Sequence, residues 1–137
     1  MAQRIADTVG EMAQEAEKQK ITLLLGNDAA TNVASGAEMA AVMKAVPSKA
    51  LGIDWNPHGA QGGYALLPKK RILNVRAMAS SVMPGAEFDN WKAILTALDK
   101  DGYNGKLALE TGASGTARFT VAHDAMDQLQ HILREVS

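Results

Sequence analysis

The 137-residue sequence contains no cysteine, no excess of either charge and no apolar run long enough to cross a membrane. The absence of cysteine excludes disulfides, thiolate metal sites and cysteine nucleophiles, and it says little about the compartment. No apolar signal core stands near the N-terminus, and no window approaches the length of a membrane span. We therefore expect a soluble, cytoplasmic protein.

The charged residues nearly balance, with 14 Lys and Arg against 15 Asp and Glu, for a formal net charge of −1. This balance gives no reason to expect nucleic acid or an anionic membrane as a partner. The nearest basic run is Lys69, Lys70 and Arg71, which leads directly into an apolar segment. Its position favours a solvated loop over a targeting or nucleic-acid patch.

Motifs of several enzyme classes are also missing. There is no Walker loop and no dinucleotide fingerprint. Ser80, Ser81 and Thr111 have no His and acidic partners in a recognisable arrangement, so a serine hydrolase is not supported. His123 and His131 are eight residues apart on one expected helix, rather than the four that would place a metal between them. This spacing favours surface histidines.

Helical and strand patterns alternate along the chain, whose length suits one domain over residues 1–137 and whose 47% hydrophobic residues can fill a core. Helical periodicity predicts helices over residues 3–18, 37–46, 90–101 and 117–135. Apolar runs predict strands over residues 21–25, 49–55, 71–75 and 106–110. Residues 62–68 are at most a short helix, and residues 79–88 read as a loop.

Details of these elements can be predicted as well. The run over residues 21–25 is apolar throughout, as expected of a strand covered on both faces. Asp89 is expected to cap the third helix and Gly102 to follow its end. The stripes expected to face the core are Ile5, Val9, Met12 and Ala16; Met39, Val42, Met43 and Val46; Trp91, Ile94, Leu95 and Leu98; and Ala122, Met126, Leu129 and Leu133.

The alternation of strands and helices favours parallel strands joined by right-handed crossovers. Two closures fit it: a small open doubly wound sheet, or part of a (β/α)8 barrel, of which four units make half. In both closures, ligands bind at the carboxyl ends of the strands. The residues at these ends are Gly26, Asn27 and Asp28; Asp54, Asn56 and His58; Arg76; and Glu110 and Thr111.

The four strand ends, taken with their surroundings, resemble the sugar phosphate isomerase and epimerase family, which has a xylose isomerase-like TIM barrel. The resemblance runs over residues 3–135, through "ITLLLGNDAATNVASGAEMAAVMKAV", "LGIDWNPHGAQGGYALLPKKRILNV" and "GAEFDNWKAILTALDKDGYNGKLALE". Its most specific parts are the block over residues 91–110 and the "WNPH" turn. It implies an α/β half-barrel, from the fourth helix of the family barrel to its eighth.

The same resemblance implies an isomerase or epimerase that interconverts aldoses and ketoses or epimeric sugars in carbohydrate metabolism. It implies one divalent metal (Mn²⁺, Mg²⁺, Co²⁺ or Zn²⁺), held by a Glu after the fifth strand, an Asp after the sixth, a His on the seventh and a Glu after the eighth. The metal polarises the sugar oxygens while carboxylates move a proton between neighbouring carbons.

Carried over by position, these implied ligands fall on Gly26, on Asn56 or Asp54, near Arg76, and on Glu110. Only Glu110 matches, so it is the candidate for acid/base catalysis and, with Asn56 and Asp54, for metal binding. Gly has no side-chain oxygen and Arg carries a permanent positive charge, which disfavours a dication.

The candidates for substrate binding are Asn27, Trp55, His58 and Arg76. Arg76 could pair with Glu110 across the strand ends, or hold a phosphate or carboxylate of a ligand. Trp55 could line a pocket. His58 could equally be a loop histidine without a role, and Asn27, like Asp28, could equally be a turn residue.

Two function classes follow: an active sugar isomerase or epimerase, or an inactive relative that only binds a sugar-like ligand or needs a partner half. DNA-repair endonucleases with the same barrel are less well supported, because they need many metal-binding histidines and this chain has three. A half-barrel leaves two sheet edges and an apolar inner face uncovered. We therefore expect either a homodimer or a missing N-terminal half-barrel as the partner.

Overall fold

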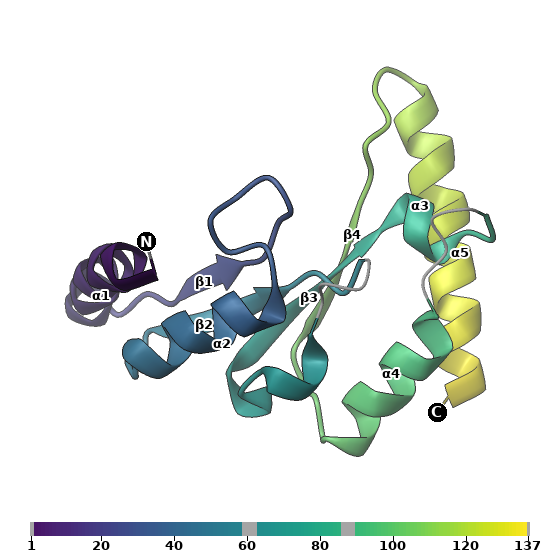
Figure 1. The fold of residues 1–137 in the computed structure, drawn as a ribbon. Helices are drawn as coiled ribbons and strands as arrows, with labels where there is room; N and C mark the ends of the chain where they lie inside the picture. Colours follow the sequence, from purple (N-terminus) through teal and green to yellow (C-terminus); the bar gives the residue numbers. More distant parts are fainter. Residues whose placement is uncertain (1, 59–62, 86–89, 137) are drawn as a thin grey trace.

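The computed structural model describes residues 2–58, 63–85 and 90–136. Strands and helices alternate along these ranges, which confirms the predicted order (Figure 1). In chain order the elements are α1 (Ala2–Gln19), β1 (Leu23–Gly26), α2 (Gly36–Ala45), β2 (Leu51–Trp55), the 3-10 helices η1 (Tyr64–Leu66) and η2 (Lys69–Arg71), β3 (Ile72–Met78), α3 (Ala79–Val82), α4 (Trp91–Lys100), β4 (Lys106–Glu110) and α5 (Ala117–Val136).

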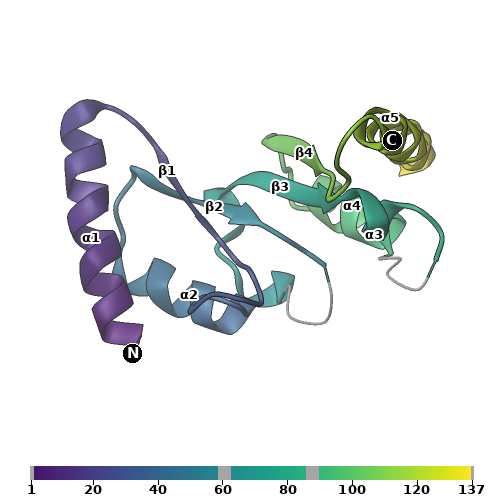
Figure 2. The ribbon, with the colours of Figure 1, turned by 90° about the horizontal axis from the view of Figure 1, so that it is seen from above.

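The four strands form one parallel sheet in the order β1-β2-β3-β4. Seen from above, α2 and α4 lie on one side of this sheet, α1 lies beyond the β1 edge and α5 lies beyond the β4 edge (Figure 2). The sheet is therefore open at both edges and covered by helices on one face. The opposite face is called the open face below.

Alternation along the strands divides the side chains between these two faces, except at a register shift between β2 and β3 where the extra residue Leu73 joins Asn74 on the same face. Residues on the helix side belong to one hydrophobic core: Leu51, Ile53, Trp55, Ile72, Val75 and Ala77. On the open face, Leu24 and Leu73 remain 46% and 41% exposed. Both approach Gly52, where an added Cβ would lie 2.5 Å from Leu73 Cδ1 and 3.0 Å from Leu24 Cδ2. Glycine at this position lets the two leucines meet over the sheet.

Local sequence signals explain where the helices begin and end. Ser35 and Glu38 form a capping box at the start of α2, and Asn90 caps α4 by accepting a hydrogen bond from the Ala93 amide. The predicted cap, Asp89, lies outside the described residues. Gly102 adopts a positive φ of 70° directly after α4, so the prediction of a glycine stop is confirmed.

Trp91 is fully buried, which confirms its prediction as a core residue. Its indole Nε1 donates to Ser81 Oγ at 3.1 Å, and Ser81 Oγ donates to the Met78 carbonyl at 2.9 Å. Ser81 lies on α3, a short helix where the sequence had predicted only a loop. A buried indole needs an acceptor, and this helical turn supplies one.

The predicted burial of the first strand and of the two outermost helices is wrong in part. Leu24 of β1 is exposed because no helix in the described part of the chain covers the open face. In α1, Ala6, Ala13 and Ala16 are buried and the predicted Ile5 and Val9 pack against the core, whereas the predicted Met12 is exposed. In α5 they are Ala125, Leu129 and Ile132, while Met126 and Leu133 are exposed. Large apolar side chains at both ends of the molecule therefore point away from its own core.

The basic run is a structural feature instead of the predicted solvated loop. The Arg71 guanidinium donates to the carbonyls of Met43, Val46, Ser48 and Leu51 at 2.7–3.1 Å. Lys69 donates to the Tyr64 carbonyl and lies over the Tyr64 ring, 3.9 Å from its centroid. Only Lys70 of the three is exposed.

Across residues 2–58, 63–85 and 90–136, no helix has both the length and the apolar character that a membrane span requires. His123 and His131 are exposed on α5 and pair with carboxylates of the same helix, Asp127 and Glu135.

Candidate functional site

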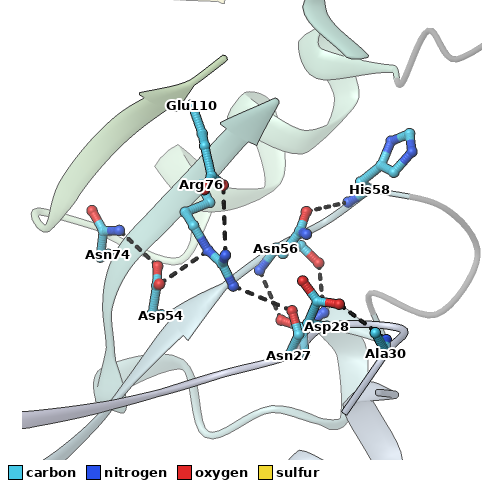
Figure 3. A network of polar contacts seen from close by, with 9 residues as sticks. All are labelled: Asn27, Asp28, Ala30, Asp54, Asn56, His58, Asn74, Arg76 and Glu110. Carbon is cyan, nitrogen blue, oxygen red and sulfur yellow. Dashed lines mark hydrogen bonds and ion pairs between the residues drawn. The ribbon is translucent and has the colours of Figure 1, made fainter. Parts of the chain in front are cut away.

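Polar side chains from all four strand ends gather at one rim of the sheet (Figure 3). The register places Gly26 beside Asp54, Asp54 beside Asn74, and Arg76 beside Ala108. Asp54, Asn74, Arg76 and Glu110 thus lie on the open face at neighbouring positions. This cluster, with Asn27 and Asn56 from the following loops, is called the rim cluster below.

Arg76 is the centre of the rim cluster. Its Nε lies 3.0 Å from Asp54 Oδ2 and its Nη1 lies 3.6 Å from Glu110 Oε2. Its Nη2 donates to the Asn27 carbonyl at 3.3 Å. Among the described residues, the buried Nε has no hydrogen bond of good geometry, so its contact with Asp54 is an ion pair and not an aligned hydrogen bond. Of the two alternatives for Arg76, the structure contains the pair with Glu110.

Both carboxylate oxygens of Asp54 have partners. Asn74 Nδ2 donates to Asp54 Oδ1 at 2.6 Å, while Oδ2 faces Arg76. The side chains of Asp54 and Arg76 are each 21% exposed, whereas that of Glu110 is 50% exposed. Asp54 is therefore held by partners on the open face, and Glu110 is the more accessible carboxylate.

Asn27 and Asn56 hold the loops after β1 and β2 together. Asn27 Nδ2 donates to the Asn56 carbonyl, and the Asn56 amide donates to Asn27 Oδ1, both at 2.8 Å. Asn27 is buried, so its amide acts as one more rung between the two strands. Asn27 lies at the rim, where its side chain fixes the backbone of Asn56 in the loop after β2.

Asp28 and His58 lie at the border of the rim cluster. Asp28 Oδ1 accepts from the Ala30 amide at 3.0 Å, a turn within its own loop. The His58 amide donates to Asn56 Oδ1 at 3.0 Å, and its imidazole points away from Arg76 (Figure 3). Neither side chain points to the centre of the rim.

Trp55 lies in the core and not at the rim. It is 4% exposed and its ring centroid is 4.9 Å from that of Tyr64, on the side of the sheet that the helices cover. Because successive side chains of a strand alternate, the open-face position of Asp54 places Trp55 on the opposite face. Its position therefore does not support the interpretation of Trp55 as the wall of a rim pocket.

The rim residues do not fit a divalent metal of the kind that the resemblance implies. Within the three described ranges, no group of three or more His, Asp or Glu side chains is arranged to hold a metal ion. Asp54 and Glu110 pair with Arg76, and Asn56 Oδ1 accepts from the His58 amide. Both carboxylates that could coordinate a cation thus already pair with a guanidinium, and the Asn56 oxygen already accepts a hydrogen bond.

Asn74 is the rim residue that the sequence analysis missed. It is the only polar residue within the apolar run "ILNV" of β3, and that interruption was the available signal. Strand alternation puts Asn74 on the same face as Arg76, two residues later.

Solved structures with the same fold include two sugar epimerases, whereas no family profile and no curated protein matches the sequence. The apo form of the 3-keto-D-glucoside 4-epimerase YcjR from E. coli matches with a TM-score of 0.73 and 15% identity over 95% of this chain. The D-psicose 3-epimerase from Clostridium cellulolyticum H10, solved with D-tagatose, matches with a TM-score of 0.74 and 17% identity over 96% of this chain. The chain has the fold of half a TIM barrel.

The chain spans only 53% and 56% of the length of these two epimerases. At such low identity the likeness establishes the fold alone. In a TIM barrel the open face becomes the inside, and active sites lie at the carboxyl ends of the strands. The rim cluster of this half-barrel lies at those ends.

Proposed function

We propose that this chain supplies the sugar-binding rim of a sugar isomerase/epimerase-like barrel and that it binds a neutral sugar without a resident divalent metal. The observation that carries the proposal is the rim cluster, with Asp54, Arg76 and Glu110 on one open face at the carboxyl ends of the strands. Carboxylates accept hydrogen bonds from sugar hydroxyls, and a guanidinium donates to sugar oxygens. Such groups suit a ligand with several adjacent hydroxyls.

The charges of the cluster favour a neutral sugar over a sugar phosphate. Asp54 and Glu110 bring two negative charges and Arg76 one positive charge, which leaves a net charge of −1. A phosphate would meet this negative charge and would have to compete with two carboxylates for Arg76. Neutral hydroxyls can join the cluster without breaking either ion pair.

The open face needs a partner that covers it before it can form a closed pocket. Coverage of about half of each solved epimerase supports a complementary four-stranded half as this partner. A second copy fits less well, because α1 and α5 both flank the sheet edges (Figure 2). Two copies would put α5 of one chain and α1 of the other at each seam, where a (β/α)8 barrel has room for one helix.

Catalysis is the second candidate function, and the exposure of Glu110 favours it. This carboxylate is half exposed, and its contact with Arg76 is the longer of the two ion pairs. It could move a proton to or from a bound sugar as a general acid or base. In that case Arg76 and Asp54 orient the hydroxyls beside the reacting carbon.

The binding proposal is tested by NMR titration of the labelled chain with D-tagatose, D-psicose and a ketohexose phosphate, each up to tens of millimolar. We expect amide shifts confined to residues 26–28, 54–58, 74–76 and 110, and weaker shifts with the phosphate. Glu110→Gln should reduce the affinity for the neutral sugars. The matched control is Glu135→Gln, which alters an exposed carboxylate on α5 and should bind as the wild type does. Amide shifts spread evenly over the chain, or no shifts at the rim, contradict the binding proposal. Sugar turnover assayed on the same samples shows whether the chain also catalyses a reaction.

A further inference from the structure

We propose that the guanidinium of Arg76 is the built-in cation of this rim, and that position 26 is glycine because the guanidinium occupies the space of its side chain. The inference concerns the same rim as the proposed function but does not require that a sugar binds there. It explains two departures from the implied ligand pattern, Gly26 and Arg76, by one physical cause.

The first support is space. A Cβ added at Gly26 would lie 2.9 Å from Arg76 Nη2, a separation that real Cβ atoms essentially never show, and 3.8 Å from Asp54 Oδ2. The glycines with a positive φ in the described ranges are Gly63, Gly102 and Gly115, so the backbone of Gly26 does not itself require glycine. What disfavours a Cβ here is the guanidinium, the far end of a side chain that would have to move away from Asp54, Glu110 and the Asn27 carbonyl to make room.

The second support is the set of oxygens around the guanidinium. They come from Asp54 at the end of β2, from Glu110 at the end of β4 and from the Asn27 carbonyl after β1. Arg76 itself stands on β3, so this single cation joins all four strand ends. A metal ion bound by strand-end ligands would join them in the same way.

The third support is charge. Asp54 and Glu110 lie on one face and repel one another unless a cation stands between them. Arg76 provides that cation permanently, because a guanidinium does not lose its proton in proteins. A dication within about 4 Å of the guanidinium would be repelled by it, so the two cations exclude each other.

A double-mutant cycle of Gly26→Ala and Arg76→Ala, followed by thermal unfolding, tests whether the guanidinium excludes a side chain at position 26. Gly26→Ala alone should lower the Tm by about 4 °C, because the added methyl displaces the guanidinium. In the Arg76→Ala background the same change should cost nothing. The matched control is Gly112→Ala, at another glycine of the rim, where a Cβ would meet nothing within 4 Å. Additive effects of the two substitutions overturn the proposal.

The charge argument is tested with Mn²⁺ alone, followed by paramagnetic broadening of the backbone amides. The wild-type chain should show no broadening centred on residues 54 and 110, and Arg76→Ala should bind Mn²⁺ at least about tenfold more tightly. Mn²⁺ bound at the wild-type rim, or equal affinity of the two proteins, overturns the proposal even if Gly26→Ala behaves as expected. Neither readout involves a sugar, so a failure here is distinguishable from a failure of the proposed function.

Discussion

Tyr103 stands on the loop before β4, where its hydroxyl donates to the Lys106 carbonyl. Burial and the negative charge of Asp54 raise the pKa of Tyr103 to about 12. Because this folded-state pKa lies above the unfolded value of 10, the neutral phenol contributes stability that is complete below pH 10 and is lost as the pH rises toward 12. We therefore expect Tyr103→Phe to flatten the decline of the unfolding free energy across this window. Urea unfolding at pH values on both sides of 10 measures it, and an unchanged slope contradicts the assignment.

At the level of single residues, the sequence predicted which polar residues lie at the strand ends. It did not predict which of them contact one another, because those contacts depend on the register between strands. Polar residues directly after apolar runs led to Asn27, Asp54, Asn56, Arg76 and Glu110. The partners of Asp54 could not be read from the sequence, because a register shift between Ile53 and Asp54 determines which β3 residues lie beside it. The position of Trp55 could have been predicted. If Asp54 lies on the open face, alternation places the next side chain, Trp55, on the face that the helices cover.

Among the secondary structure elements, η2 carries the most consequential contact outside the rim. The Arg71 side chain donates hydrogen bonds to carbonyls at the end of α2 and at the start of β2. The carbonyls at the end of a helix have no partner within that helix. Arg71→Met should lower the unfolding free energy by about 3 kcal/mol, because several part-buried carbonyls lose their donor. The control is Lys70→Met, which removes the same charge from an exposed neighbour and should change stability by less than about 0.5 kcal/mol. Equal effects in urea unfolding would show that charge and not hydrogen bonding matters here.

The element boundaries show what local patterns can and cannot predict. α2 and α4 were predicted together with their core-facing stripes, because each covers the sheet within this chain. α1 and α5 were predicted as helices, but their buried faces were predicted only in part, since Met12, Met126 and Leu133 are exposed. Each of these outer helices has apolar residues against the core and, besides them, larger exposed apolar side chains such as Met12 and Met126. Hydrophobic periodicity alone does not show which apolar face of an outer helix packs against the core of this chain and which stays exposed.

For the whole molecule, the open face and the two outer helices decide how the chain behaves alone. Leu24 and Leu73 are exposed on the open face, yet closing the barrel with a second copy would crowd two helices into each seam. We therefore expect light scattering at micromolar concentration to give the monomer mass of 14.5 kDa, together with binding of a hydrophobic dye. The double variant Leu24→Lys with Leu73→Lys should lose most of the dye signal at a modest cost in stability, because each leucine is only partly covered by the sheet.

The matched control is Leu66→Lys, since Leu66 is also exposed but lies on η1, outside the sheet and its open face. It should leave the dye signal unchanged. A dimer of twice the monomer mass that the Leu24 and Leu73 substitutions dissociate, but that Leu66→Lys does not, would mean that a second copy closes the inner face after all. In that case α1 or α5 has to leave its present position, and the amide exchange of that helix would be faster in the dimer than in the monomer.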